Sequence, residues 1–85
     1  MKTHANEMTA PMEKMNKKMD SMQMTGDPDH DFVEMMIVHH QAAIEMAQTE
    51  IDSGKDTTIK KLAKKIIEDQ TKEIEEMQQW LKKQH

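Results

Sequence analysis

Methionine is the residue type that gives this sequence its chemical character. The 85-residue chain has 11 methionines and no cysteine, so any soft ligand in it must be a thioether sulfur. Thioethers are neutral and soft, and they favour Cu(I) over zinc and hard cations. Leucine occurs only at Leu62 and Leu81, although it specifies a helical core better than the more flexible methionine does. This bias indicates a use for sulfur beyond packing.

Five methionines near the N-terminus follow one another at spacings of four, three, four and three residues. At this spacing they would project from one face of a helix. The set consists of Met8, Met12, Met15, Met19 and Met22, and Met24 extends it into the following linker. A methionine seam between packed helices is the structural alternative. The absence of leucine, isoleucine and valine from the stripe favours metal binding.

Two pairs of soft ligands lie in the middle of the chain. Met35 with His39, and Met36 with His40, are each four residues apart, so each pair could reach one ion from successive helical turns. Imidazole would also accept Cu(II). His39 shares its stripe with Met35 and Met46, whereas His40 interrupts an aliphatic stripe and could equally be a hydrogen-bonded core histidine.

Glycine and proline divide the chain into three helical segments. The first helix is expected over about 11–22, with proline at its first position and a frayed lead. Asp27 and Pro28 are typical of a helix start, and Gly54 is expected to end that second helix as a left-handed cap. The third helix should open at Asp56 and run nearly to the end of the chain.

The middle segment is apolar over a wide arc, so it should be the central helix or part of a subunit interface. Counting outward from the two turns predicts which residues lie at one level, to within about one turn, or roughly 5 Å. This places Met77 near Met35 and Met36, and Met12 and Met15 near His39 and His40. Methionines from three helices and the histidine pair are therefore expected to meet.

Composition excludes several classes of function. Charged residues make up 33% of the chain with a net charge of -4 and mixed signs, which argues against a nucleic-acid partner. The lack of cysteine excludes disulfides, zinc-thiolate sites and thiol catalysis. No apolar run is long enough for membrane insertion or a signal-peptide core, so we expect the mature form of any exported protein. Di-iron, zincin and serine-nucleophile motifs are absent, and we expect no enzymatic activity.

Residues 27–81 resemble the ferritin-like helical family catalogued as domain of unknown function 305. The resemblance rests on DPDHDFVEMMIVHHQAAIEMAQTEIDSG and LAKKIIEDQTKEIEEMQQWL, and the methionine-rich first segment lies outside it. It implies a periplasmic or secreted helical bundle, and it makes the double histidine a family signature. Some members, the CopM-type copper-resistance proteins, bind Cu(I) and Ag(I) through methionine and histidine.

These observations predict an all-α, three-helix antiparallel bundle, equivalent to a ferritin-like half or a truncated four-helix bundle. Residues 1–26 form the methionine-rich helix and linker, and 27–85 form the helical hairpin core. Because members of the family often carry four helices, a homodimer would complete the core.

The expected function is binding of Cu(I), with Ag(I) as its surrogate and Cu(II) through histidine, for copper buffering, resistance or delivery to a copper pump or acceptor protein. The expected metal ligands are Met36, His39, His40, Met46, Met77, Met35, Met8, Met12, Met15, Met19, Met22 and Met24. A methionine-rich interaction module and a structural helical oligomer without metal are the alternatives.

Overall fold

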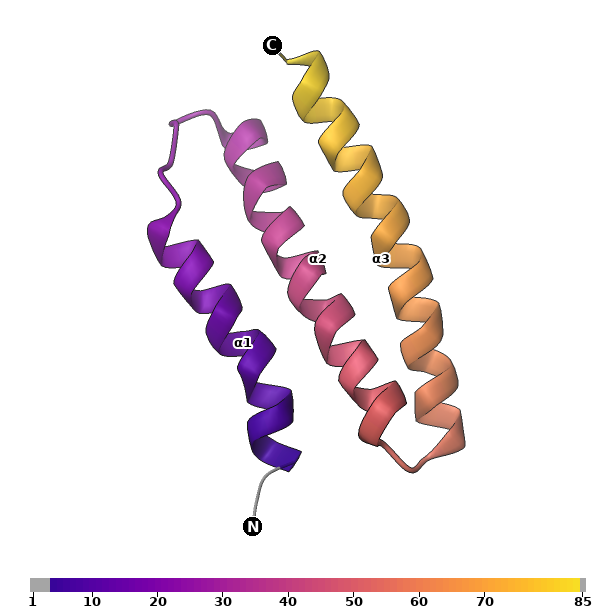
Figure 1. The fold of residues 1–85 in the computed structure, drawn as a ribbon. Helices are drawn as coiled ribbons and strands as arrows, with labels where there is room; N and C mark the ends of the chain where they lie inside the picture. Colours follow the sequence, from indigo (N-terminus) through magenta and orange to yellow (C-terminus); the bar gives the residue numbers. More distant parts are fainter. Residues whose placement is uncertain (1–3, 85) are drawn as a thin grey trace.

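The computed structural model describes the backbone of residues 4–84 and the side chains of residues 7–84. It has three helices: α1 (His4–Ser21), α2 (Pro28–Ser53) and α3 (Thr57–Lys83). No strand occurs in this part of the chain. The all-α, three-helix antiparallel fold expected from the sequence is confirmed (Figure 1). Within the same residues, no helix is long and apolar enough to cross a membrane.

Asp27 and Asp56 start α2 and α3 as the sequence predicts. The Asp27 carboxylate accepts a hydrogen bond from the Asp29 N–H at 3.1 Å, and the Asp56 carboxylate accepts one from the Ile59 N–H at 3.1 Å. Each cap satisfies a backbone donor that has no partner within its helix. Pro28 follows Asp27 at the first helical position, where its missing N–H has no effect.

The start of α1 differs from the prediction. The helix begins at His4 and Pro11 lies inside it, so proline does not mark the first turn. A proline inside a helix costs about 3 kcal/mol, because it removes a hydrogen bond and crowds the preceding turn. Here Pro11 is buried and lines a small cavity with Val38 and Ala42 of α2. Packing of its ring against α2 offsets part of that cost.

The glycine with a positive φ is Gly26, and not Gly54 as the sequence predicts. Gly54 ends α2 with φ of -73° and ψ of 166°, an extended conformation, so the predicted left-handed cap is wrong. Gly26, in the loop between α1 and α2, has the positive φ, at 90°. Gly54 is required for space: an added Cβ would lie 2.5 Å from the Glu50 carbonyl oxygen.

The Asp31 side chain organises the loop between α1 and α2. Its carboxylate accepts hydrogen bonds from the Thr25 N–H at 3.0 Å, the Thr25 hydroxyl at 2.9 Å and the Gly26 N–H at 3.2 Å. The bond from the Thr25 backbone is the main cause of a lowered Asp31 pKa, because donors to a carboxylate favour its charged form. This carboxylate holds the chain reversal that sets α1 beside α2.

The three helices form one flat layer with α2 in the middle. α2 packs against both α1 and α3, whereas α1 and α3 do not contact each other over the described residues. The layer measures 45 by 25 by 14 Å (Figure 1). The prediction that the middle helix is central is therefore confirmed. The buried residues of α2 and α3 are mostly small: Ile37, Ala42, Ala47 and Ala63.

Candidate metal-binding face

A polar groove marks one face of the layer between α1 and α2. Lys14 and Lys18 of α1 line it together with Gln41 and Glu45 of α2. The Lys14 ammonium lies 3.0 Å from the Glu45 carboxylate, in an ion pair whose side chains are 60% and 41% exposed. We call the side of the layer that carries these four residues the lysine face.

The opposite face carries sulfur and imidazole. Met12 precedes Lys14 by two residues, and His39 precedes Gln41 by two. Two residues correspond to about 200° of rotation, so Met12 and His39 point away from the lysine face. Met19 shares the stripe of Met12, and Met35 and Met46 share the stripe of His39. We call this side, defined by Met12, Met19, Met35, His39 and Met46, the thioether face.

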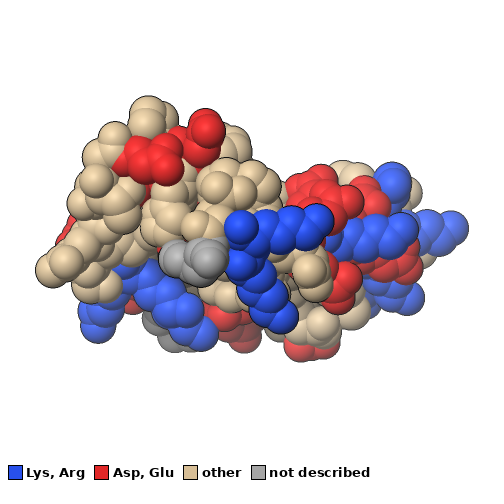
Figure 2. Space-filling view, turned by 90° about the horizontal axis from the view of Figure 1, so that it is seen from above, with Lys and Arg blue, Asp and Glu red and all other residues tan. Residues whose placement is uncertain are grey.

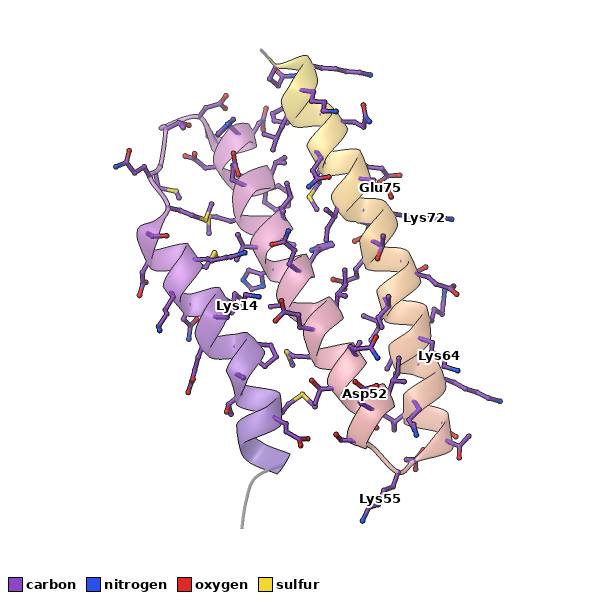
Figure 3. All side chains as sticks on the ribbon, viewed as in Figure 1. Lys14, Asp52, Lys55, Lys64, Lys72 and Glu75 are labelled. Carbon is purple, nitrogen blue, oxygen red and sulfur yellow. The ribbon has the colours of Figure 1, made fainter. Side chains whose placement is uncertain are left out.

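Figure 2, seen from above, shows the same asymmetry. Lysine side chains project from the lower edge of its left half, where α1 lies, and no lysine is seen at the upper edge there, which is largely uncharged with some acidic side chains. Sulfur atoms follow the seam between α1 and α2 in Figure 3. Around α1, the lysine face therefore carries positive charge, and the thioether face carries methionine and histidine side chains.

None of the ten described methionines is buried. Met12, Met24 and Met35 are exposed by 42%, 54% and 36%. The others are half-buried: Met8, Met15, Met19, Met22, Met36, Met46 and Met77. Large apolar side chains are exposed to a similar extent in this thin layer, with Ile59 at 46%, Leu62 at 53% and Phe32 at 61%. The ten described methionines keep part of their surface accessible from solvent.

Met8 and Met15 lie between α1 and α2. Met15 lines the small cavity beneath Pro11, and Met8 lines a pocket near the turn between α2 and α3, together with Thr49 and Ile59. The sequence predicts that Met15 lies near His39 and His40. Val38, which directly precedes His39, lines the same cavity as Met15, so Met15 lies within about one turn of the predicted level.

The double histidine is divided between two environments. The His40 Nε2 lies 2.5 Å from the Glu73 carboxylate of α3, whereas His39, about 100° further round α2, is exposed on the thioether face. His40 is 12% exposed and Glu73 53%. Met36 precedes His40 by one turn and lies on the α3 side of α2. The two histidines therefore lie beside separate groups of methionines.

Glu73 is the contact that sequence reasoning missed. It belongs to a run of acids along α3 that includes Glu68, Asp69, Glu75 and Glu76. Composition and spacing do not distinguish one of these from another. Only the register between α2 and α3 selects Glu73 as the partner of His40.

Met77 lies on the far side of α2 from the methionines of α1. It lines a groove with Phe32, Val33 and Trp80, about one turn from the level predicted beside Met35 and Met36. Because α1 and α3 are not in contact within residues 4–84, the structure does not bring Met77 to the α1 stripe. The expected convergence of three helices becomes two groups, one on each side of α2.

The remaining predicted ligands lie where α1 ends. Met22 follows the last residue of α1, and its N–H donates to the Met19 carbonyl at 3.2 Å. Met24 is exposed in the loop. Both continue the sulfur-rich region beyond the thioether face toward the start of α2. Across residues 7–84, no group of three or more histidine, aspartate or glutamate side chains is arranged to hold a metal ion, and the candidate site consists of thioethers with single imidazoles.

The fold and this face define an antiparallel all-α protein with accessible thioether side chains. The chain belongs to the family described as domain of unknown function (DUF305), whose model matches residues 1–81. The match includes α1, so the methionine stripe lies within the family domain, and the resemblance extends further toward the N-terminus than residue 27. No curated protein matches this chain.

Proposed function

We propose that this protein binds Cu(I), and Ag(I) as its surrogate, through the methionines of the thioether face together with His39. The observation that carries the proposal is the accessibility of the thioethers, since no described methionine is buried. Exposure is shared with aliphatic residues such as Ile59 and Leu62, so the proposal combines it with the chemistry of the thioether, a soft donor in a chain without cysteine. An ion approaching from solvent needs that exposure.

The geometry of α2 supports binding on this face. Met35 and His39 are one turn apart on the same side of the helix, so their side chains are neighbours. Met12 and Met19 face the same side from α1, which packs directly against α2. Soft thioethers with one imidazole form a ligand set suited to Cu(I), and imidazole extends it to Cu(II).

Met36, His40 and Met77 form a second candidate group on the α3 side of α2. Histidine ligands of metals commonly hold a carboxylate with their other ring nitrogen, which fixes the orientation of the ring. Glu73 gives His40 this kind of contact through Nε2, leaving Nδ1 available for an ion. The contact therefore supports His40 as a ligand as well as a structural residue.

The proposed role is reversible holding of copper outside the cytoplasm, in the periplasm or after secretion. An open face suits a protein that buffers copper, or one that passes the ion to a pump or another acceptor protein, because the ligands remain accessible. We propose no catalysis. The supporting observations are the exposed thioethers and the absence of competing thiols.

The test is titration of the full chain with Cu(I) and Ag(I) under reducing conditions, followed by native mass spectrometry, with Zn(II) as the control ion. Replacing Met12, Met35 and Met46 by leucine and His39 by glutamine preserves side-chain volume and removes the ligands. We expect Cu(I) affinity to fall by at least about tenfold. The matched control, Met36→Leu with His40→Gln and Met77→Leu, measures the second group separately.

Failure to bind Cu(I), or equal binding of Zn(II), would refute the proposal. Unchanged Cu(I) affinity in both sets of variants would also do so. In that case the exposed methionines favour the second candidate, a surface for protein partners, because flexible methionine side chains adapt to different apolar surfaces.

A further inference from the structure

The two aromatic side chains of this protein line the same groove. The sequence has one phenylalanine, one tryptophan and no tyrosine, and the packing of α2 against α3 brings Phe32 and Trp80 to one groove between the start of α2 and the end of α3. Phe32 is 61% exposed and Trp80 is half-buried, so both rings keep surface open to solvent. The groove has a volume of about 350 Å³, at the lower end of the range for small-molecule sites.

Each of the two helices places a carboxylate beside its aromatic ring. Asp29 precedes Phe32 by three residues on α2. Glu76 precedes Trp80 by four residues on α3. At these spacings the acid and the ring lie on the same side of their helix. Both carboxylates line the groove, together with a valine and a methionine, and within residues 7–84 no lysine, arginine or histidine lines it. The groove therefore combines aromatic and apolar walls with negative charge.

The two groove carboxylates have no partner among the side chains that the structure describes. In this part of the chain, neither the Asp29 nor the Glu76 carboxylate forms a hydrogen bond or an ion pair. By contrast, Asp69 and Glu73 of α3 each contact a basic side chain. The positive end of the α2 dipole favours an acid at Asp29, but Glu76 lies in the second half of α3 and gains no such stabilisation. Two unpaired negative charges therefore border one groove.

We propose that this groove binds a small organic cation of the quaternary ammonium class. The face of an aromatic ring attracts a cation, and the two carboxylates add to that attraction. A primary ammonium group is strongly hydrated, whereas the methyl groups around a quaternary nitrogen hold water weakly and can contact the rings and the apolar walls. The proposed ligand is distinct from copper, because Asp29, Phe32, Glu76 and Trp80 are not proposed copper ligands.

The experiment uses Trp80 as its own reporter, because it is the only tryptophan and the chain has no tyrosine. The metal-free full chain is titrated with tetramethylammonium chloride at constant ionic strength, and the tryptophan fluorescence is recorded. Sodium chloride and tert-butanol, a neutral molecule of similar size, are the control solutes. We expect a saturable change with a dissociation constant on the order of 1 mM, because exposed cation–π contacts and solvent-screened carboxylates are individually weak. Neither control solute should give saturation.

Conservative variants separate the contributions of charge and ring. The double variant Asp29→Asn with Glu76→Gln keeps the shape of the groove and should weaken tetramethylammonium binding by about tenfold. Phe32→Leu keeps an apolar wall and should weaken it by about threefold. The matched control is Glu75→Gln, which removes the same charge from the neighbouring residue, on the side of α3 that faces away from α2 (Figure 3). This control should bind like the unmodified chain, and circular dichroism verifies the helical content of every variant.

A fluorescence response that never saturates overturns the inference, as does equal saturation by tert-butanol. Unchanged affinity in the double variant, or an equal loss in Glu75→Gln, overturns it too. The result is independent of copper binding, because the titration is metal-free and every proposed copper ligand remains in these variants. A chain that binds Cu(I) but not tetramethylammonium refutes only the groove, and the reverse result refutes only the metal site.

Discussion

Replacing Gly54 by alanine tests how closely the turn between α2 and α3 is packed. An added Cβ would lie 2.0 Å from the Glu50 side-chain oxygen Oε2 and 2.5 Å from the Glu50 backbone carbonyl oxygen. The side chain can rotate away. The carbonyl cannot, because it accepts the Gly54 N–H at 2.7 Å at the end of α2. The strain therefore has to be relieved by a shift of the backbone.

Two opposing effects set the magnitude. Forcing extra atoms into a packed site costs about 1–3 kcal/mol. Alanine also restricts the unfolded chain and returns about 0.4–1 kcal/mol. The φ of -73° at Gly54 is acceptable to alanine, so no dihedral strain is added. We expect Gly54→Ala to lower the free energy of unfolding by about 1–2 kcal/mol, measured by urea denaturation at one fixed protein concentration, since association would change the apparent stability.

Measuring Gly54→Ala in protein that already carries Glu50→Ala identifies which Glu50 atom causes the loss of stability. In Glu50→Ala protein the side-chain contact is gone and the carbonyl contact remains, so most of the loss caused by Gly54→Ala should persist. If Gly54→Ala is neutral, or if its effect disappears in Glu50→Ala protein, the reasoning from the backbone contact is wrong. Gly26→Ala is the comparison: nothing lies within 4 Å of its added Cβ. Its expected loss of about 1–2 kcal/mol comes from the left-handed conformation alone, and Glu50→Ala should not alter it.

Two other predictions concern ionisable side chains. The Asp31 pKa is lowered from its ordinary 3.8, chiefly by the Thr25 backbone N–H. The charged carboxylate therefore stabilises the fold at pH values above its ordinary pKa. This stabilisation is lost as the pH falls through the lowered pKa. Asp31→Asn should lose less stability than the unmodified chain in that acidic window, measured by unfolding at a series of pH values, and identical pH profiles would contradict the assignment. For His40 and Glu73, the 53% exposure of Glu73 predicts a coupling energy of at most about 1 kcal/mol in a double-mutant cycle with alanine. A clearly larger value would mean that the pair is screened from water.

Much of the secondary structure is readable from the sequence because its causes are local. The caps at Asp27 and Asp56 depend on residues within one turn, and the spacing from Met8 to Met19 defines one stripe on a helix wherever that helix packs. The start of α1 was placed too late because the burial of Pro11 against α2 is a distant contact. The left-handed cap predicted at Gly54 was wrong for a similar reason: a turn sequence shows that glycine is needed, but the path of the chain determines whether φ or space requires it.

The candidate site shows the same division. Sequence alone determines that any soft donor must be a thioether, that Met35 and His39 are neighbours on one helix, and that the middle helix should be covered on two sides. Only the tertiary structure decides that α1 and α3 take opposite sides of α2, which separates Met77 from the α1 stripe and directs His40 to Glu73 while His39 stays exposed. Helical periodicity fixes the angle between two residues on one helix. Which angle meets a neighbouring helix depends on the loops and on contacts between residues far apart in the chain, and a single sequence does not specify these.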